Sequence, residues 1–254
     1  MARAAVPGRL SARLAWRVAK LLEVREETRS AHTLVFHVPG WPGHLAGQHV
    51  DVRLTAEDGY STQRSYSIAA PTEGERVELT VQRVEDGEVS PYLVDDLVVG
   101  GPVELRGPVG GWFVWRPADP DPVLLVAGGS GLVPLMAMIR ARRNAGSRVP
   151  FRLLCSVRTP DDLLYANELR RPHAGDGGLD VTLIYTRAAP EGWPRRPDRI
   201  SAADLVAYGW PPDFAPQCYV CGPTPFVESV ADLLVGLGHD PARIRTERFG
   251  PSGG

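Results

Sequence analysis

An arginine, a tyrosine and two serines follow one another as Arg64-Ser65-Tyr66-Ser67, and these residue types suit the binding of a nucleotide. An arginine can neutralise a phosphate, an aromatic ring can cover a flat heterocycle, and a serine hydroxyl can hydrogen-bond a ring nitrogen. On residue types alone, an ordinary strand that ends before Pro71 explains the stretch better. The chemistry therefore depends on what else the chain places nearby.

A second candidate is the turn Gly87-Glu88-Val89-Ser90, which precedes a short helical stretch over 91–97. A serine hydroxyl and the unpaired N–H groups of a helix N-terminus can together hold a phosphate. Two phosphate-competent stretches in one small domain would be unusual without a ligand.

A third candidate is the glycine turn Gly128-Gly-Ser-Gly131, between an apolar run at 123–127 and apolar residues at helical spacing over 132–140. This order indicates a buried parallel strand that leads into a helix. Glycines let the backbone approach a ligand closely, and the helix N-terminus suits a pyrophosphate. The turn lacks the G-x-G-x-x-G fingerprint. A plain strand-to-helix turn without a ligand explains it nearly as well.

The elements that carry these stretches differ between the two halves of the chain. From Trp16 to about Trp115 the strand signals are short and alternating, with turns between them, which favours an antiparallel barrel. The expected strands include 16–24, 33–38, 48–54 and 77–83. The first half therefore reads as an all-β domain, for which we expect residues 1–117.

The run Arg116-Pro-Ala-Asp-Pro-Asp-Pro122 breaks both periodicities and reads as a linker. Beyond it, strands alternate with helices, which predicts a parallel, doubly wound, Rossmann-like α/β sheet over residues 118–254. The expected strands are 123–127, 151–155, 181–185 and 218–221, and the expected helices are 132–140, 163–170 and 224–236, with a loop between 185 and 218. Ligands of such a sheet bind beyond the carboxyl ends of its strands.

Composition excludes several classes of protein. With 28 basic and 30 acidic residues and one lysine, Lys20, the chain offers nucleic acid no basic run. It has no secretory apolar region and no segment long enough to cross a bilayer, so we expect a cytoplasmic protein that binds no membrane.

Three cysteines make no disulfide framework or metal set. The six histidines show no metal-ligand spacing; they are His32, His37, His44, His49, His173 and His239. The arginine-rich start of the chain reads as a basic arm or short helix.

The order of the motifs is more specific than any one of them. The motifs are Arg-x-Tyr-Ser at 64–67, Gly-x-x-Ser at 87–90, Gly-Pro-Val-Gly-Gly at 107–111, Gly-Gly-Ser-Gly-x-x-Pro at 128–134 and Cys-Gly-Pro at 221–223. In this order they resemble the ferredoxin–NADP reductase family of flavoprotein electron transferases, over roughly residues 16–249. The resemblance implies a six-stranded antiparallel flavin-binding barrel followed by a nicotinamide-nucleotide domain, with the two rings meeting between them.

The resemblance also implies roles for particular residues. Arg64 would pair with the flavin pyrophosphate, Tyr66 would pack along the isoalloxazine and Ser67 would face N5. The full flavin-binding set is Arg64, Ser65, Tyr66, Ser67, Gly87, Val89, Ser90 and Phe249. The nicotinamide-nucleotide set is Gly129, Ser130, Gly131, Ser156, Arg158, Arg187, Cys221, Gly222 and Pro223. The catalytic set is Ser67, Cys221 and Glu247; packing or an exposed ion pair explains Glu247 and Phe249 equally well.

The coenzyme and the electron acceptor stay open at this point. Arg158 and Arg187 suit the 2′-phosphate of NADPH, with Arg195 and Arg196 as further candidates, but solvated arginines with NADH bound explain them nearly as well. FAD is the expected flavin, although the motifs also suit FMN. Since no cysteine set would ligate an iron–sulfur cluster, we expect a separate acceptor: a ferredoxin, a haem protein or an oxygenase. The alternatives are a flavin or quinone reductase with a small-molecule acceptor and a non-catalytic nucleotide-binding module. The sequence leaves the oligomeric state unknown.

Overall fold

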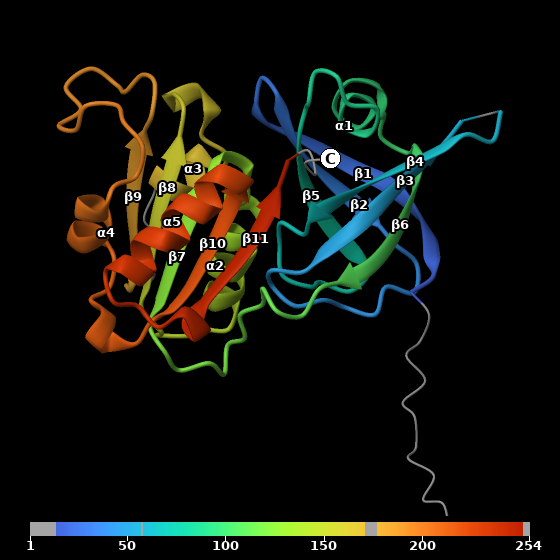
Figure 1. Cartoon of the computed structure of the whole chain (residues 1–254). Helices are drawn as coiled ribbons and strands as arrows, with labels where there is room; N and C mark the ends of the chain where they lie inside the picture. Colours follow the sequence, from blue (N-terminus) through green and yellow to red (C-terminus); the bar gives the residue numbers. More distant parts are fainter. Residues whose placement is uncertain (1–13, 57, 171–176, 251–254) are drawn as a thin grey trace, which may run out of the picture.

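The computed structural model describes residues 14–56, 58–170 and 177–250. Most of the expected basic arm lies outside these residues. The described part forms two layered units side by side, a barrel and a sheet covered by helices on both faces (Figure 1). None of the described helices is long and apolar enough to cross a membrane.

The first unit is a six-stranded antiparallel sheet in the order β4-β3-β6-β1-β2-β5. Its strands are β1 (Trp16–Thr28), β2 (Ala31–His37), β3 (His49–Thr55), β4 (Ser61–Ser67), β5 (Arg76–Gln82) and β6 (Pro102–Val109). An antiparallel bridge from Ile68 to Leu79 brings the end of β4 against β5 and curls the sheet into a barrel. Alternating apolar side chains such as Val50 and Val52 fill its interior.

The turn at Gly87 leads into α1 (Val89–Pro91) and a single π-helical turn at Tyr92–Asp96, which lie against the barrel near β3, β4 and β5. Leu93 anchors this segment in the barrel core. The short helix expected over 91–97 is therefore present in an irregular form.

The second unit is a five-stranded parallel sheet in the order β11-β10-β7-β8-β9. Its strands are β7 (Val123–Gly128), β8 (Phe151–Val157), β9 (Leu179–Tyr185), β10 (Gln217–Pro223) and β11 (Ile244–Phe249). Its helices are α2 (Leu132–Asn144), α3 (Ala166–Arg170), α4 (Ala202–Tyr208) and α5 (Thr224–Gly236). Along β7, Leu125 packs in the core with α2, whereas Leu124 and Val126 pack in the core with α5. β7 is therefore buried on both faces, as its unbroken apolar run predicts.

Two predictions for the second unit, one of a helix and one of a loop, were wrong in part. The helix expected from residue 163 begins only at Ala166, because Tyr165 has a left-handed backbone with φ of 54° that no helix tolerates. The segment expected to be a loop between β9 and β10 contains α4, whose start is fixed by a capping box between Ser201 and Asp204. The apolar signal for α4 is weak, since Leu205 is its main buried apolar side chain.

Candidate functional site

Arg64 and Tyr66 lie on one face of β4, because alternate residues of a strand point the same way. Tyr66 faces Ser90, and burial raises the pKa of Tyr66 to about 12, while the Arg64 charge and the Ser90 hydrogen bond oppose the shift. The Ser90 hydroxyl also accepts a hydrogen bond from the Val84 N–H, 3.0 Å away. Among the described residues, Arg64 forms no salt bridge, so its guanidinium is available for an anion. β4 and the turn before α1 thus bring a cation, an aromatic ring and a hydroxyl together.

Ser65 and Ser67 lie on the opposite face of β4. The Ser65 hydroxyl donates to Asp51, 2.6 Å away, and Asp51 in turn holds Arg106 at 2.7 Å. The Ser65 side chain therefore points away from the face of β4 that carries Arg64. The Ser67 hydroxyl instead donates to Glu247 of β11, 3.2 Å away, and so links the barrel to the second unit.

Glu247 and Cys221 are paired residues of neighbouring strands β11 and β10. Burial raises the pKa of Glu247 to about 7, and the hydrogen bond from Ser67 opposes that shift. Burial, and then the Glu247 charge, raise the pKa of the Cys221 thiol well above its ordinary value, so the thiol stays neutral. Of the three neighbouring groups Ser67, Cys221 and Glu247, the Glu247 carboxyl is therefore the one that exchanges a proton near neutral pH.

The glycine turn between β7 and α2 combines an open position and a crowded one. Gly129 has a φ of 56°, and an added Cβ there would meet nothing within 4 Å. At Gly131 an added Cβ would overlap the carbonyl group of Cys221. One glycine thus opens a cradle for a ligand, and the other lets α2 begin directly against β10.

A cavity of about 290 Å³ lies beyond the carboxyl ends of the parallel strands. It is lined by Gln82, Gly128, Gly129, Ser130, Ser156, Val157, Arg158, Asp162, Leu164, Thr186, Pro223, Phe226 and Phe249. Gln82 belongs to β5 of the barrel, so the cavity lies between the two units. The structure thus gathers Gly129, Ser130, Ser156, Arg158, Pro223 and Phe249 of the predicted set around one space.

The predicted arginines separate into two groups. Arg158 lines the cavity, and the backbone N–H of Arg187 donates to the Arg158 carbonyl, 2.9 Å away. Arg195, in contrast, binds both oxygens of Asp204 at 2.9 Å and stabilises the start of α4. The guanidinium of Arg195 is thus engaged within the fold, which favours Arg158 over Arg195 as the partner of a coenzyme phosphate.

The predicted set lacks several residues of the cavity wall, among them Phe226 and Gln82. Phe226 lies on the first turn of α5, and its ring is so close to Gly128 and Gly222 that a Cβ on either would fall within 3.0 Å of it. Its position just after Cys-Gly-Pro is the signal that would have found it. Gln82 ends a barrel strand and carries no such signal, since nothing local connects β5 to the second unit.

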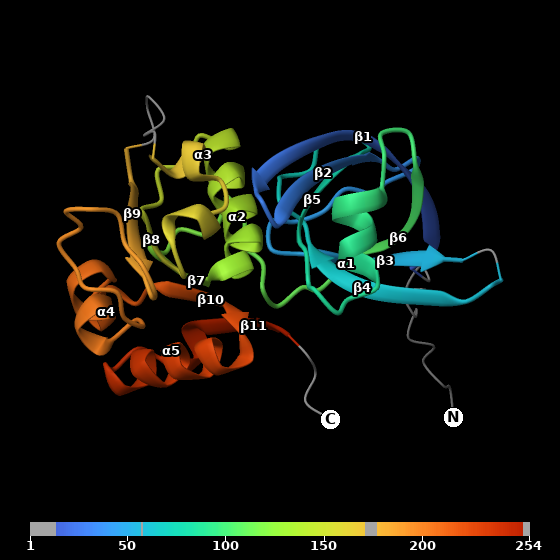
Figure 2. The same cartoon turned by 90° about the horizontal axis from the view of Figure 1, so that it is seen from above.

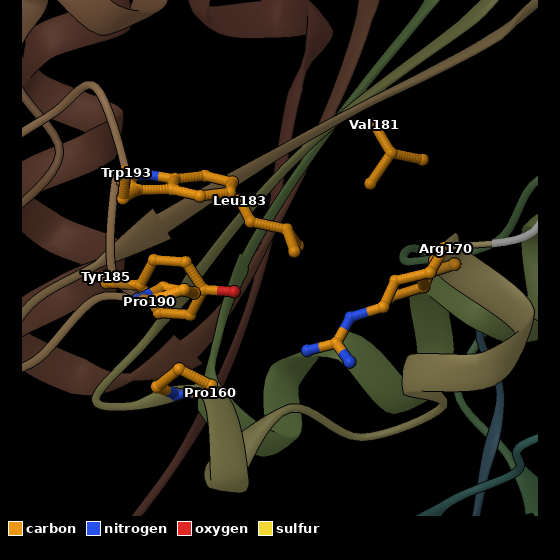
Figure 3. A pocket seen from close by; sticks show the side chains of 8 residues that line it. Pro160, Arg170, Val181, Leu183, Tyr185, Pro190 and Trp193 are labelled. Carbon is orange, nitrogen blue, oxygen red and sulfur yellow. The ribbon is translucent and has the colours of Figure 1, made fainter.

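A larger hollow of about 590 Å³ lies elsewhere, beside the outer strand β9 (Figure 3). It is lined by Pro160, Leu169, Arg170, Val181, Leu183, Tyr185, Pro190 and Trp193. None of these residues belongs to the predicted site. The smaller cavity between the units is therefore where the candidate chemistry converges.

Comparisons with known proteins agree with this geometry. The oxidoreductase FAD-binding domain matches residues 18–114, and the oxidoreductase NAD-binding domain matches residues 125–232. Ferredoxin–NADP reductase B of Sorangium cellulosum is 32% identical over 239 residues, covering 91% of this chain and 96% of that protein. The reductase subunit of glycine betaine monooxygenase from Pseudomonas aeruginosa is 33% identical over 211 residues, or 81% of this chain. The matched region spans only 56% of that relative's length.

Solved structures share the fold. The FAD/NAD-binding domain of a nitric oxide dioxygenase from Vibrio cholerae superposes with a TM-score of 0.81 at 24% identity, covering 92% of this chain and 99% of that one. The cytochrome b5 reductase domain of Ulva prolifera nitrate reductase gives 0.80 at 20% identity, covering 92% and 97%. The barrel corresponds to an oxidoreductase FAD-binding domain, and the parallel sheet corresponds to an oxidoreductase NAD-binding domain. The chain belongs to the ferredoxin–NADP reductase family.

The residues present fit both cofactors of that family. The Arg64 guanidinium, which donates to the Gln63 carbonyl, suits a flavin phosphate, and the Tyr66 ring and the Ser90 hydroxyl suit the rest of a flavin. The open position at Gly129 suits a second pyrophosphate. The cofactors are therefore FAD and a nicotinamide dinucleotide.

Proposed function

We propose that this chain is an FAD-dependent NAD(P)H oxidoreductase that passes electrons to a separate acceptor protein, such as a ferredoxin, a haem protein or an oxygenase. The observation that carries the proposal is the cavity between the units, where the glycine turn and Arg158 face a barrel residue, Gln82. Relatives named as reductase components of monooxygenase and dioxygenase systems support the acceptor class. We place the domain boundary at residues 117 and 118, within the stretch that joins β6 to β7.

Within this proposal the chain's residues bind and orient. Arg64 and Ser90 hold the flavin phosphates, and Tyr66 supports the ring face, with Val89 and Gly87 supplying backbone contacts. When bound, FAD would supply the electron chemistry, namely acceptance of a hydride and release of electrons singly or in pairs. The protein's contribution is to align the two rings and to exclude water from between them.

The second unit places the nicotinamide nucleotide. Gly129, Ser130 and Gly131 hold its pyrophosphate, with Ser156 at the ribose end and Gly222 and Pro223 bordering the nicotinamide. We assign Arg158, which lines the cavity, and Arg187 to the phosphate that distinguishes NADPH, and we therefore propose NADPH as the preferred coenzyme.

Ser67, Cys221 and Glu247 form the catalytic group of the proposal. Ser67 donates to Glu247 at 3.2 Å, and Glu247, with a pKa of about 7, holds or releases a proton beside the flavin site. Phe249, paired with Pro223 in the next strand, covers the site from the end of β11.

The test measures electron transfer to different acceptors. Purified protein should reduce a one-electron acceptor protein with NADPH, using flavin that remains bound through gel filtration. Protein that elutes colourless and reduces free added flavin instead would show a flavin reductase. Protein that retains no flavin and turns over no acceptor would show a nucleotide-binding module without catalysis.

A further inference from the structure

A ring of hydrogen bonds joins the barrel to the second unit beside the cavity wall, which Leu164 and Gln82 help to form. The Tyr165 hydroxyl donates to the Thr80 hydroxyl of β5, 2.5 Å away, and the Thr80 and Thr33 hydroxyls are 2.7 Å apart. Thr33 donates to one oxygen of Glu27 at 2.7 Å, and the backbone N–H of Tyr165 donates to the other at 3.1 Å. The ring therefore begins and ends on Tyr165.

The ring has only one direction of donation. Because the Thr33 proton is used on the Glu27 carboxylate, Thr80 must donate to Thr33, and Thr80 can then accept from Tyr165. Tyr165, Thr33 and Thr80 are all buried, so each hydroxyl depends on this partner set. Burial raises the pKa of the Tyr165 hydroxyl, which therefore stays a donor. Sliding or rotating the two units against each other would leave buried hydroxyls without partners.

Tyr165 makes these hydrogen bonds from an unusual backbone conformation. Its φ of 54° lies in the left-handed region, which a side chain other than glycine occupies at a cost in free energy. That conformation ends the preceding turn, delays the start of α3 to Ala166 and directs both the N–H and the hydroxyl of Tyr165 at the barrel.

Arg140 of α2 forms a second contact beside the ring. Its guanidinium lies over the Tyr165 ring, 4.7 Å from the centroid, and binds Glu168 at 2.7 Å. One nitrogen also donates to the Ala69 carbonyl, 2.9 Å away. Ala69 lies two residues after Ser67, so this bond ties the second unit to the end of the strand that carries Arg64 and Tyr66.

Two sets of polar contacts thus flank the cavity, in addition to the apolar cluster in which Ala46 and Ala69 of the barrel unit pack with Met138 of α2. On one side Ser67 meets Glu247. On the other, Tyr165 binds β5 and β1, and Arg140 of α2 binds the Ala69 carbonyl; Figure 2 shows α2 facing the barrel. Interfaces between domains of one chain otherwise allow relative motion unless they are large and apolar. We propose that Tyr165 and Arg140 are positioning residues, which hold the nicotinamide-nucleotide domain in register with the flavin domain for hydride transfer. The part concerning hydride transfer rests on the proposed function.

The experiment uses the full chain, free of cofactor, so that it does not depend on the activity. Spin labels are attached to Val98→Cys in the barrel and Val206→Cys on α4, both about 70% exposed in the native protein, while the native cysteines are buried. The distance distribution between the labels is compared among Tyr165→Phe, Thr80→Val and Thr80→Ser. Tyr208→Phe, which removes a hydroxyl from the exposed Tyr208 of α4, is the matched control.

We expect Tyr165→Phe and Thr80→Val to broaden the distribution, whereas Thr80→Ser and Tyr208→Phe keep the native width. A native width in Tyr165→Phe and Thr80→Val would overturn the proposal, as would broadening in Thr80→Ser equal to that in Thr80→Val. Both test variants remove a hydroxyl and keep the side-chain volume nearly constant, so the fold is retained.

A kinetic arm then tests the link to function. In FAD-loaded protein, we expect Tyr165→Phe to lower the limiting rate of flavin reduction by NADPH about tenfold and to leave the coenzyme dissociation constant unchanged, because misalignment acts on the reacting geometry. An unchanged limiting rate in a variant with a broadened distribution would refute the positioning role. If wild-type protein itself reduced no flavin, the proposed function would fail, and the distance measurement would still decide whether the ring fixes the domains.

Discussion

Replacing Glu247 by glutamine should change the pH dependence of stability in a way that the structure predicts in sign and size. In the folded protein burial raises the pKa of Glu247 to about 7, whereas an unfolded chain has the ordinary value of 4.5. Between these two values the folded state binds the additional proton, so the free energy of unfolding of the native protein falls as pH rises from about 4.5 to 7. The full difference amounts to about 3 kcal/mol.

Glutamine mimics the protonated carboxyl and does not titrate, so Glu247→Gln should lack this loss. Near pH 4.5 the two proteins should be almost equally stable, and at pH 8 the variant should be more stable by up to about 3 kcal/mol, or about 6–12 °C in Tm for a chain of this size. The assay is thermal unfolding of the cofactor-free chain at both pH values. Glu228→Gln, at an exposed carboxyl on α5, is the control. A stability difference that is the same at both pH values would refute the argument that burial of Glu247 raises its pKa.

Three further predictions follow from the site. Gly131→Ala should lower the free energy of unfolding in urea by about 3 kcal/mol, because the added Cβ would overlap the β10 backbone. Gly129→Ala should lower it by only about 1 kcal/mol, because the space there is open. Equal losses in the two variants would contradict the close packing at Gly131. Arg64→Ala should weaken FAD binding about 30-fold in a fluorescence titration, with the fold intact, since a charged phosphate partner is lost; an unchanged affinity would remove Arg64 from the flavin site. Arg158→Ala should raise the KM for NADPH about tenfold more than that for NADH; equal increases would reject the 2′-phosphate role.

Much of the architecture was predictable because it depends on local patterns. The run Val123–Gly128 is apolar at every position, and the structure buries it on both faces of the parallel sheet. α5 occupies the predicted residues, Thr224–Gly236. The antiparallel barrel followed from alternation of the type seen along β3. In each case the side-chain period alone specifies the element and its buried face.

The parts that escaped prediction depend on contacts between distant segments. Tyr165 breaks the expected helix because its N–H and hydroxyl bind Glu27 and Thr80, which precede it by 138 and 85 residues. Gln82 reaches the cavity only because the barrel lies against the second sheet. The local sequence around residue 165 predicts a helix and carries no information about Glu27 and Thr80, so the tertiary contacts override the helical preference.

The sequence predicts a site as an ordered set of motifs, and it predicts nothing of the electrostatics of these residues. The family resemblance predicts that Glu247 lies near the flavin, whereas its raised pKa results from its burial where β11 meets β4. Likewise the sequence offers Arg158 as a candidate for a phosphate and Arg195 as a further one. Only the fold shows that Asp204 already holds Arg195.

The most direct test of the central claim is an absorbance spectrum of the purified protein, recorded without oxygen before and after addition of NADH and then of NADPH. The account predicts a bound-flavin band that bleaches on mixing, faster with NADPH than with NADH. A protein that shows no flavin band, and that binds neither FAD nor FMN on reconstitution, would contradict it.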